Sequence, residues 1–495
     1  MIRQDAKLIP MKSFLRLFLL AILAVSAHAN PGRKPNIVLV LTDDQAVDTI
    51  AATGTWGCGP ADIQTPNLDR LVRTGTLFSR AYNMGAWNGA VCVASRSMLN
   101  TGRFVWHSQA AENDHYKTLV GGGRMWSQRM KSAGYETYMS GKWHVETPVG
   151  KLFDHASHVR QGMPTTVPSA YNRPADGKPD TWLPWDESNG GYWAGGKHWS
   201  EVLADDAESF VRQAADAGKP FFMYLAFNAP HDPRQSPREF VERYPLDKVR
   251  VPGNFLPSNP HHVAMGLGPM GPKGMRDETL APFPRTEAAI KTHRREYYAL
   301  VTHLDVQIGR ILDALDRAGL AETTYVILTS DHGLALGRHG LMGKQSMYDH
   351  SVRVPFILRG PGIPRGESRD ARIYMQDAMA TALDLAGADV TGIDFKSVMP
   401  LVRKERAEQY DAIYGAFEAK SQRAITMGDH KLILYPSSRA TLLFDVAKDP
   451  LEMRDLSADP ATLETRRALF AGLRKLQKQT GDTLDLAKTF PALAE

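Results

Sequence analysis

Four short apolar runs constrain the fold of this chain more than any other feature. They cover residues 36–41, 221–227, 325–329 and 355–358. Continuous runs rich in β-branched and aromatic residues are typical of strands buried on both faces of a parallel sheet. Amphipathic helical patterns lie between them, at residues 122–133, 199–217 and 297–318. The alternation predicts an α/β sheet with helices packed against it.

The length and a change of pattern near residue 395 predict two structural parts. A chain of 495 residues exceeds one ordinary core. Beyond residue 395 the sequence carries four short strand patterns and one helical pattern, at residues 410–417, 424–427, 431–435, 441–445 and 461–480. We therefore expect a large α/β domain over residues 30–395. Residues 396–495 are expected to form a smaller α+β subdomain with a short antiparallel sheet and a terminal helix.

The N-terminus has the features of a signal peptide. Basic residues lie between positions 3 and 16, an apolar run covers residues 17–25, and Ala27 and Ala29 form a small-x-small cleavage site. The run is too short to span a membrane as a stable helix. We exclude residues 1–29 from the fold and expect a periplasmic or secreted protein without stable membrane insertion. An uncleaved anchor is the alternative.

The charge balance limits the classes of partner. The chain has 59 Lys and Arg against 54 Asp and Glu, a formal net charge of +5, and no dense basic run. Nucleic acid is therefore not expected as a partner, whereas a local basic pocket for an anionic substrate is compatible with this balance.

Polar residues follow three of the apolar runs. Asp43 and Asp44 follow the first run, His231 follows the second, and Asp331 and His332 follow the third. In open α/β sheets, ligands bind beyond the carboxyl ends of the strands. Clustered carboxylates are costly without a cation, and hard oxygen ligands favour Ca²⁺ or Mg²⁺ over zinc. The alternative is that Asp43 and Asp44 only cap a helix.

Residues 245–290 are rich in Pro, Gly and Met and show no periodicity. Long irregular segments inside domains are usually functional. We expect an irregular excursion here that lies over a substrate site.

The segment Cys-Val-Ala-Ser-Arg at residues 92–96, continued by Leu-Asn-Thr-Gly-Arg at residues 99–103, carries the most specific motif. It resembles the segment from which type I sulfatases of the alkaline phosphatase superfamily make their nucleophile. In that family the cysteine is oxidised to formylglycine, whose hydrate has two hydroxyl groups. One attacks sulfur, and the other later expels sulfate. The alternative is that Cys92 is a small buried residue before a helix.

Two details of this motif can be tested. Cys58 and Cys92 are the two cysteines of the chain, and an exported protein would by default pair them in a disulfide. Formylglycine at position 92 excludes that bond. Position 94 is Ala where many family members have Pro, which leaves open which formylglycine-generating maturase acts on the chain.

Further segments resemble the family in the same order along most of the chain. They are residues 36–44, 65–71, 134–144, 230–233, 331–344, 353–362 and 443–452. The resemblance implies an alkaline-phosphatase-like three-layer α/β/α sandwich with a smaller C-terminal α+β subdomain. It also implies an enzyme that hydrolyses sulfate esters.

The resemblance assigns the metal ligands. Asp43, Asp44, Asp331 and His332 would hold one divalent ion, Ca²⁺ or Mg²⁺, together with an oxygen of modified Cys92. Position 332 is Asn in many family members and His in others.

The resemblance also assigns the catalytic roles. Arg96 and His144 would orient the formylglycine diol, with His144 as the base that helps expel sulfate. Lys142 and Lys344 would neutralise the sulfate oxygens. His231 would donate a proton to the leaving alcohol.

The expected substrate and partner is a sulfated carbohydrate, a family-level association. The candidate sugar contacts are Trp87, Arg285, His303, His350 and Arg353. Two alternatives remain. One is a phosphodiesterase or phosphonate monoester hydrolase built on the same nucleophile, and the other is an inactive glycan-binding pseudo-sulfatase in which Cys92 stays unoxidised. A two-metal alkaline phosphatase is disfavoured, because its additional Asp and His ligands are not evident.

Overall fold

The computed structural model describes residues 34–53, 63–175, 177–267 and 275–495. The predicted signal peptide and Cys58 lie outside these residues. The internal contacts of the chain divide it after Lys34, and the description below concerns the unit Pro35–Glu495.

A nine-stranded sheet lies at the centre of this unit, in the order β10-β2-β9-β7-β1-β6-β4-β5 with β8 beside β2. Its strands are β1 (Asn36–Thr42), β2 (Thr76–Tyr82), β4 (Glu136–Lys142), β5 (His155–Arg160), β6 (Phe221–Ala226), β7 (Thr324–Ser330), β8 (Arg353–Val354), β9 (Phe356–Arg359) and β10 (Glu367–Tyr374). β1 pairs in parallel with both β6 and β7. The four apolar runs therefore form strands, and three of them lie side by side in parallel as predicted.

The fourth run, β9, differs from the expectation. It pairs antiparallel with both β7 and β2. A parallel neighbour of β7 would need a long crossover, usually a helix. The chain between β7 and β9 contains only the one-turn helix α9 (Asp349–Val352) and the short strand β8. The chain therefore turns back without a crossover helix, and β9 runs antiparallel to β7. The sheet is thus mixed.

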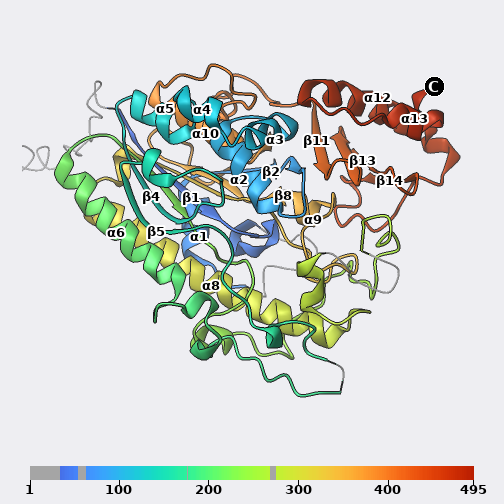
Figure 1. Ribbon diagram of the computed structural model, residues 1–495, viewed down its shortest axis with the longest axis horizontal. Helices are drawn as coiled ribbons and strands as arrows, with labels where there is room; N and C mark the ends of the chain where they lie inside the picture. The colour runs from blue at the N-terminus through green and yellow to red at the C-terminus, as the bar shows by residue number, and fades with distance from the viewer. Residues whose placement is uncertain (1–33, 54–62, 176, 268–274) are drawn as a thin grey trace, which may run out of the picture. The chain divides into compact units, whose positions relative to one another are not determined.

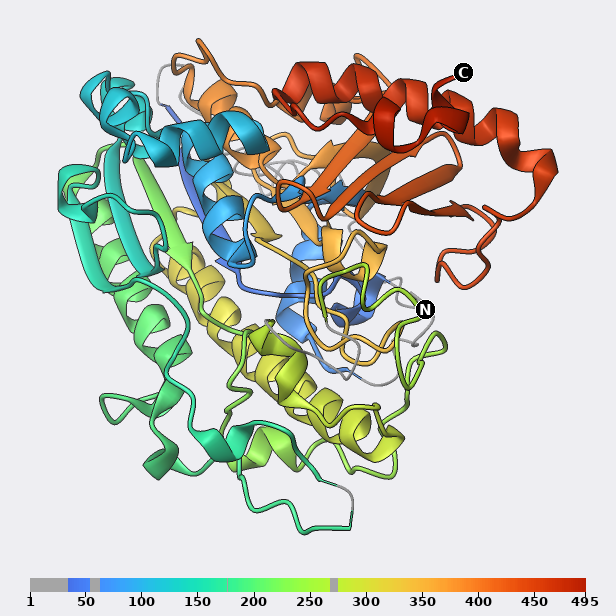
Figure 2. The ribbon, with the colours of Figure 1, turned by 45° about the vertical axis from the view of Figure 1, so that its right-hand side comes forward.

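Helices cover both faces of the sheet (Figure 1; Figure 2). Val38 and Val40 of β1 belong to a core with α1 (Pro66–Thr74), α6 (Trp199–Ala217) and α8 (Glu287–Arg317). Ile37, Leu39 and Leu41 point to the other face, into a core with α2 (Val91–Thr101), α5 (Trp126–Ser132) and α10 (Asp377–Ala386). The alternation follows from the two-residue period of a strand. The predicted three-layer α/β/α arrangement is confirmed.

α8 begins earlier than its apolar pattern predicts, at Glu287, because the Thr286 side chain caps it by accepting from the Ala289 N–H. The remaining helices are α3 (Val105–Asn113), α4 (Lys117–Gly121), α7 (Arg238–Val241), α11 (Met399–Val402), α12 (Leu463–Thr480), α13 (Leu486–Thr489) and α14 (Pro491–Ala494).

A second sheet of five strands has the order β14-β13-β12-β11-β3. The strands are β3 (Gly85–Ala86), β11 (Ala412–Phe417), β12 (Gln422–Met427), β13 (His430–Tyr435) and β14 (Ala440–Asp445). The last four are antiparallel to their neighbours, as predicted, and β3 adds in parallel to β11. Helix α12 packs on this sheet through Leu469, Phe470 and Leu473.

The second sheet shares a core with the large domain. Val91, Ala94 and Met98 of α2 belong to the same cluster of buried apolar side chains as the interior of the second sheet. The predicted division at residue 395 therefore crosses one continuous hydrophobic core.

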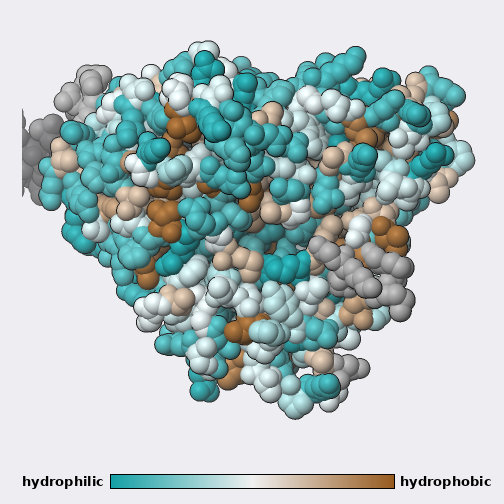
Figure 3. Space-filling model, in the orientation of Figure 1, coloured by the Kyte–Doolittle hydropathy of each residue, from teal (hydrophilic) through white to brown (hydrophobic). Residues whose placement is uncertain are grey.

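Among the described residues, few large apolar side chains are exposed. On the face drawn in Figure 3 they lie scattered among polar residues. No helix in the described part of the chain is both long and apolar enough to span a membrane.

Candidate active site

The parallel strands bring the predicted polar residues to one edge of the sheet. Asp43 and Asp44 directly follow β1, Lys142 is the last residue of β4, and Asp331 directly follows β7. Strands β7, β1, β6 and β4 are neighbours in that order and run parallel. Their carboxyl ends therefore meet at one place, where ligands bind in open α/β sheets.

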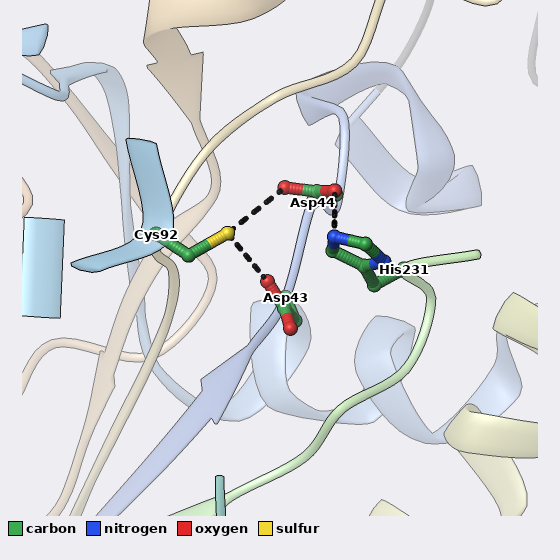
Figure 4. A group of neighbouring side chains, drawn as sticks. All are labelled: Asp43, Asp44, Cys92 and His231. Atoms are coloured by element: carbon green, nitrogen blue, oxygen red, sulfur yellow. Dashed lines mark hydrogen bonds and ion pairs between the residues drawn. The ribbon is translucent and has the colours of Figure 1, made fainter. Parts of the chain in front are cut away.

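Cys92 lies in the first turn of α2, and its sulfur points at the carboxylates that follow β1 (Figure 4). The Cys92 Sγ lies 3.3 Å from Asp43 Oδ1 and 3.9 Å from Asp44 Oδ1. The Nζ of Lys344 donates to the same sulfur at 3.1 Å. Cys92 is a buried free thiol. Its side chain thus lies where acidic and basic groups meet.

Two lysines pair with the two aspartates. Lys142 donates to Asp43, and Lys344 Nζ lies 2.5 Å from Asp44 Oδ2. Burial alone would raise the pKa of Asp43, but Lys142 and the other nearby cations hold it well below its usual value. For Asp44 burial prevails over Lys344, and its pKa is well above the usual value. The protein's own cations therefore stabilise the ionised form of Asp44 less than that of Asp43.

Asp331 is held by protein donors on both oxygens. Arg96 Nε donates to Asp331 Oδ2 at 2.9 Å, and the backbone N–H of Asp44 donates to Oδ1 at 3.2 Å. Arg96 also donates to the carbonyl oxygen of Lys142 at 2.6 Å. Burial raises the pKa of Asp331, and the negative charge of Asp43 adds to this. Arg96 thus ties α2 to the ends of β4 and β7.

His231 and His144 come from two loops at the same edge. His231 Nε2 lies 3.6 Å from Asp44 Oδ2, and its Nδ1 lies 2.8 Å from the Asp232 carbonyl oxygen. Burial, with Lys344, lowers the pKa of His231 to about 4. His144 has a left-handed backbone (φ 55°), and its buried Nδ1 has no hydrogen-bond partner. Burial, with Lys142, lowers its pKa to about 3, so its imidazole is neutral and can accept a proton.

A cavity of about 300 Å³ opens above Cys92. It is lined by five of the predicted catalytic residues, Cys92, Lys142, His144, His231 and Lys344. The other lining residues are Gly89, Ala90, Val91, Met163, Met275, Arg276, Asp277 and Gln345. The volume lies at the lower end of the range for small-molecule sites.

Comparison with known families agrees with this geometry. A family model described as sulfatase matches residues 35–388, and a model of the C-terminal part of N-sulphoglucosamine sulphohydrolase matches residues 337–479. The chain belongs to the sulfatase family. The sulfatase is thus a type I member of the alkaline phosphatase superfamily and a sulfuric ester hydrolase, as the sequence predicted.

Individual relatives are distant but match along most of their length. An N-acetylglucosamine-6-O-sulfatase of Bacteroides thetaiotaomicron is 26% identical, over 94% of this chain and 90% of the relative. An arylsulfatase of Clostridium perfringens is 26% identical, over 86% of this chain and 90% of the relative.

Two solved structures show the same fold. One, a protein in complex with its substrate D-glucosamine-2-N,6-O-disulfate, has a TM-score of 0.69 and 24% identity over 91% of this chain and 99% of the other. A phosphonate monoester hydrolase of Silicibacter pomeroyi has a TM-score of 0.70 and 20% identity over 91% of this chain and 96% of the other.

The side chains of the sulfatase suit a hard divalent cation. Among the described residues, one group of possible ligand atoms lies within 4.8 Å of one another, from Asp43, Asp44, Cys92 and His231 (Figure 4). The adjacent buried carboxylates of Asp43 and Asp44 supply the oxygen ligands that such an ion prefers. Asp331 and His332, both predicted as ligands, are not in this group.

His332 remains available as a ligand. It is buried, neither ring nitrogen has a hydrogen-bond partner, and burial lowers its pKa to about 3. Neutral imidazole is the form that binds metals. Asp331 could act as a ligand only by sharing the oxygens that Arg96 and the Asp44 backbone now occupy.

The five predicted sugar contacts are not part of the cavity above Cys92. They are Trp87, Arg285, His303, His350 and Arg353, and none of them lines it. His303 Nε2 lies 3.1 Å from the Glu201 carboxylate, and Arg285 binds Glu278 and several backbone carbonyls. The other three also form hydrogen bonds within the protein. These five residues therefore stay predictions, and the structure places them outside the cavity with partners inside the protein.

The sequence analysis missed Arg276, Asp277 and Gln345, which do line the cavity. The signal that could have found the first two was the irregular segment 245–290. It was expected to lie over a substrate site, and with Met275 it does supply one wall of the cavity. No motif or spacing marks the individual residues.

Proposed function

We propose that this sulfatase removes sulfate from a sulfated carbohydrate with a formylglycine nucleophile derived from Cys92. The observation that carries the proposal is the position of the Cys92 sulfur, 3.3 Å from Asp43 and 3.1 Å from Lys344, in the cavity that His144 and His231 also line. The carbohydrate class is supported by relatives whose names specify amino-sugar sulfates.

The properties of the unmodified thiol support its conversion. Burial raises the pKa of the Cys92 thiol well above its usual value, and Asp331 and Asp43 raise it further. A neutral thiol is a poor nucleophile. A formylglycine hydrate at the same position has two hydroxyl groups, one for attack and one for release of the product.

A divalent ion is part of the proposal, with Asp43 and Asp44 as ligands and His332 and Asp331 as further candidates. When bound, a Ca²⁺ or Mg²⁺ ion would supply positive charge that favours the ionised nucleophile and polarises the sulfate group.

In the first half-reaction, one hydroxyl of residue 92 loses its proton to water and attacks sulfur, and the bond from sulfur to the alcohol oxygen breaks. Lys344 and Lys142 provide positive charge at the floor of the cavity, where the sulfate charge shifts. His231 gives the leaving oxygen a proton. The free histidine is neutral at neutral pH, and the negative charge of the bound substrate favours its protonated form.

In the second half-reaction, neutral His144 takes the proton of the second hydroxyl. The carbon–oxygen bond to the sulfate then breaks, the aldehyde re-forms and sulfate leaves. Water adds to the aldehyde and restores the diol. Because its pKa is low, His144 is unprotonated before this step, and the negative charge of the bound sulfate ester favours its protonated form as the proton is transferred.

Export and maturation complete the proposal. Residues 1–29 would direct the protein to the periplasm or outside the cell, where sulfated polymers are accessible. A formylglycine-generating maturase would be a transient partner that acts on the motif around Ala94.

Mass spectrometry of the tryptic peptide 81–96 from the native host tests the nucleophile. Formylglycine predicts a mass about 18 Da below that of the cysteine peptide, and a reaction with a hydrazide probe. An unmodified cysteine in this peptide, or a Cys58–Cys92 disulfide that links it to the peptide with Cys58, would contradict the proposal and favour a pseudo-sulfatase.

Parallel assays separate the reaction classes. We expect kcat/KM on an aryl sulfate to exceed that on the matching aryl phosphate diester and aryl phosphonate. The opposite order would assign the chain to the phosphonate and phosphodiester hydrolases of the same fold.

A further inference from the structure

The 3₁₀ turn η8 (Arg276–Leu280) joins the two loops that carry the proposed acid and the sulfate-binding lysine. On one side, Arg276 donates to both carboxylate oxygens of Asp232, at 2.5 and 2.9 Å. Asp232 directly follows His231, and its carboxylate lies 3.3 Å from His231 Nδ1. Arg276 therefore lies on the side of the cavity where the alcohol leaves.

On the other side, Asp277 contacts the neighbour of the lysine. Gln345 Nε2 donates to Asp277 Oδ2 at 3.1 Å, and Gln345 Oε1 accepts from the Lys344 backbone N–H at 3.0 Å. Arg276 and Asp277 also pair with each other at 2.5 Å. The two side chains thus form one connected wall between the His231 and Lys344 loops.

Together with the adjoining Asp232, the wall of Arg276 and Asp277 carries more negative than positive charge. Although burial opposes it, Lys344 and Arg276 lower the pKa of Asp277, and His231 and Arg276 hold that of Asp232 far below its usual value. Both carboxyl groups are therefore ionised, and together with the Arg276 cation they sum to one negative charge. The positive charges of Lys142 and Lys344 lie deeper, beside Asp43, Asp44 and Cys92.

The wall is accessible from the cavity. The Arg276 side chain is 33% exposed, and both Arg276 and Asp277 line the cavity. Besides the charged groups already placed at its floor, the described lining residues are uncharged, namely Gly89, Ala90, Val91, Met163, Met275 and Gln345. Within the described lining above this floor, the only cation that a second anionic group on the substrate would meet is Arg276. Asp232 and Asp277 already neutralise its charge.

We propose that Arg276 and Asp277 bind the alcohol part of the substrate and determine its specificity. The wall selects an alcohol with hydroxyl or amino groups beside the ester and discriminates against a second sulfate or a carboxylate. The inference rests on the proposed function and narrows its substrate class. Carboxylate oxygens accept hydrogen bonds from hydroxyl and ammonium groups, whereas a like charge placed against them weakens binding.

Competitive inhibition tests the inference without requiring turnover of a particular sugar. The substrate is an activated aryl sulfate, and the competitors are glucosamine 6-sulfate, its N-acetyl form and its N-sulfated form. Their substituents on nitrogen are positive, neutral and negative. We expect the inhibition constant to rise in that order, with the disulfate binding about tenfold or more weakly than the free amine.

A charge-neutralising variant tests whether the wall causes the difference between these inhibition constants. Asp277→Asn keeps the shape and removes one negative charge, so the disulfate and the amine should then bind within about threefold of each other. Asp313→Asn is the matched control, because Asp313 pairs with Arg70 on an exposed helix face and should leave the ratio unchanged. Should Asp277→Asn fold poorly, added salt on the wild type gives a second readout, because screening should reduce the ratio.

The outcomes separate the two proposals. Tighter binding of the disulfate than of the amine, a ratio unaffected by Asp277→Asn, or no inhibition by any of the three sugars would overturn the specificity wall while aryl sulfate hydrolysis persists. Loss of aryl sulfate hydrolysis by a protein with verified formylglycine would instead overturn the proposed function.

Discussion

Lys344 and His231 both contact Asp44, but their other neighbours differ. Lys344 Nζ is 2.5 Å from Asp44 and 3.1 Å from the Cys92 sulfur, so it lies directly beside the proposed nucleophile. His231 Nε2 is 3.6 Å from Asp44, and the next residue, Asp232, binds the specificity wall. Their contributions to the reaction should therefore depend differently on the leaving group.

We expect His231→Ala to lower kcat/KM on a carbohydrate sulfate by roughly 10²–10⁴-fold and to have much less effect on an activated aryl sulfate. A sugar alcohol needs a proton as its bond to sulfur breaks, whereas a nitrophenolate is stable without one. Lys344→Ala removes positive charge beside the sulfate that both substrates share, so both should slow by similar factors.

The measurement is kcat/KM for each variant on both substrates. The control variants are His115→Ala and Lys248→Ala, whose side chains are largely exposed and outside the cavity. Equal losses on both substrates for His231→Ala would show that it binds the sulfate rather than protonating the alcohol.

At the residue scale, sequence could predict the floor of the site better than its walls. Asp43 and Asp331 follow buried strands, and parallel strands must bring their carboxyl ends together, so the placement follows from the pattern alone. Arg276 and Asp277 lie in an irregular segment, and their position depends on an ion pair with Asp232 and a hydrogen bond from Gln345, both far away in the sequence. Such contacts leave no local periodicity.

At the element scale, the second sheet fastens the loop that carries Lys344. Gln422 of β12 donates to the Gln345 carbonyl oxygen at 3.0 Å. Lys431 of β13 donates to the Met347 carbonyl oxygen at 3.1 Å and pairs with Asp349 and Glu452. All of these side chains are buried. The C-terminal residues thus contribute to the site by holding a loop and not by lining the cavity.

We predict that Lys431→Met lowers the free energy of unfolding by about 3–5 kcal/mol, because it leaves the buried Glu452 carboxylate without its cation and leaves Asp349 with only the more distant Arg353. The loss of the Met347 contact should also lower kcat on the aryl sulfate. Urea unfolding followed by tryptophan fluorescence measures the first effect, and steady-state kinetics the second.

Lys448→Met is the matched control for this variant. Lys448 pairs with Asp445 at the end of the neighbouring strand β14, but its side chain is 88% exposed. Exposed pairs contribute little, so its removal should leave stability and kcat unchanged within error. Similar losses in both variants would show that the buried cluster has no special role.

The strands themselves were predictable, but the direction of β9 was not. Continuous burial identifies residues 355–358 as a strand, yet burial is the same for either direction. Direction depends on the route of the connecting chain, and residues 331–352 form an active-site loop where a crossover helix would give a parallel strand. A loop of the active site thus takes the place of the usual crossover helix. The apolar pattern of the strands does not show which connection is present.

At the scale of the whole molecule, we predict that the bound metal adds to stability as well as to activity. Asp43, Asp44 and Asp331 are buried together, and burial raises the pKa of the latter two. A cation there relieves their repulsion, and ligand saturation at 100-fold above Kd adds about 2.7 kcal/mol.

Chelation of the sulfatase should therefore lower both Tm and kcat, and Ca²⁺ or Mg²⁺ should restore both. Asp43→Asn should weaken the recovery, because it removes one charged ligand from the site. Full activity and an unchanged Tm in a sample verified as metal-free would contradict the metal site.

The two sheets share a core, and this should make them unfold together. Val91, Ala94 and Met98 lie on α2, the helix that carries Cys92, and they pack in one cluster with Tyr414 and Ile433 of the second sheet. A residue buried between two parts loses its packing when either part unfolds, which couples their stabilities. Neither sheet can open without exposing the helix that holds the nucleophile.

We therefore predict a single unfolding transition for residues 30–495, with coincident midpoints by far-UV circular dichroism, tryptophan fluorescence and calorimetry. A fragment of residues 30–395 should lack a cooperative transition and sulfatase activity, because it exposes the apolar cluster that Val91, Ala94 and Met98 of α2 share with β11–β14. The control is a chain that lacks only residues 1–29. Two separated transitions, or a folded and active 30–395 fragment, would show instead that the C-terminal residues form an independent subdomain attached to a self-sufficient catalytic domain.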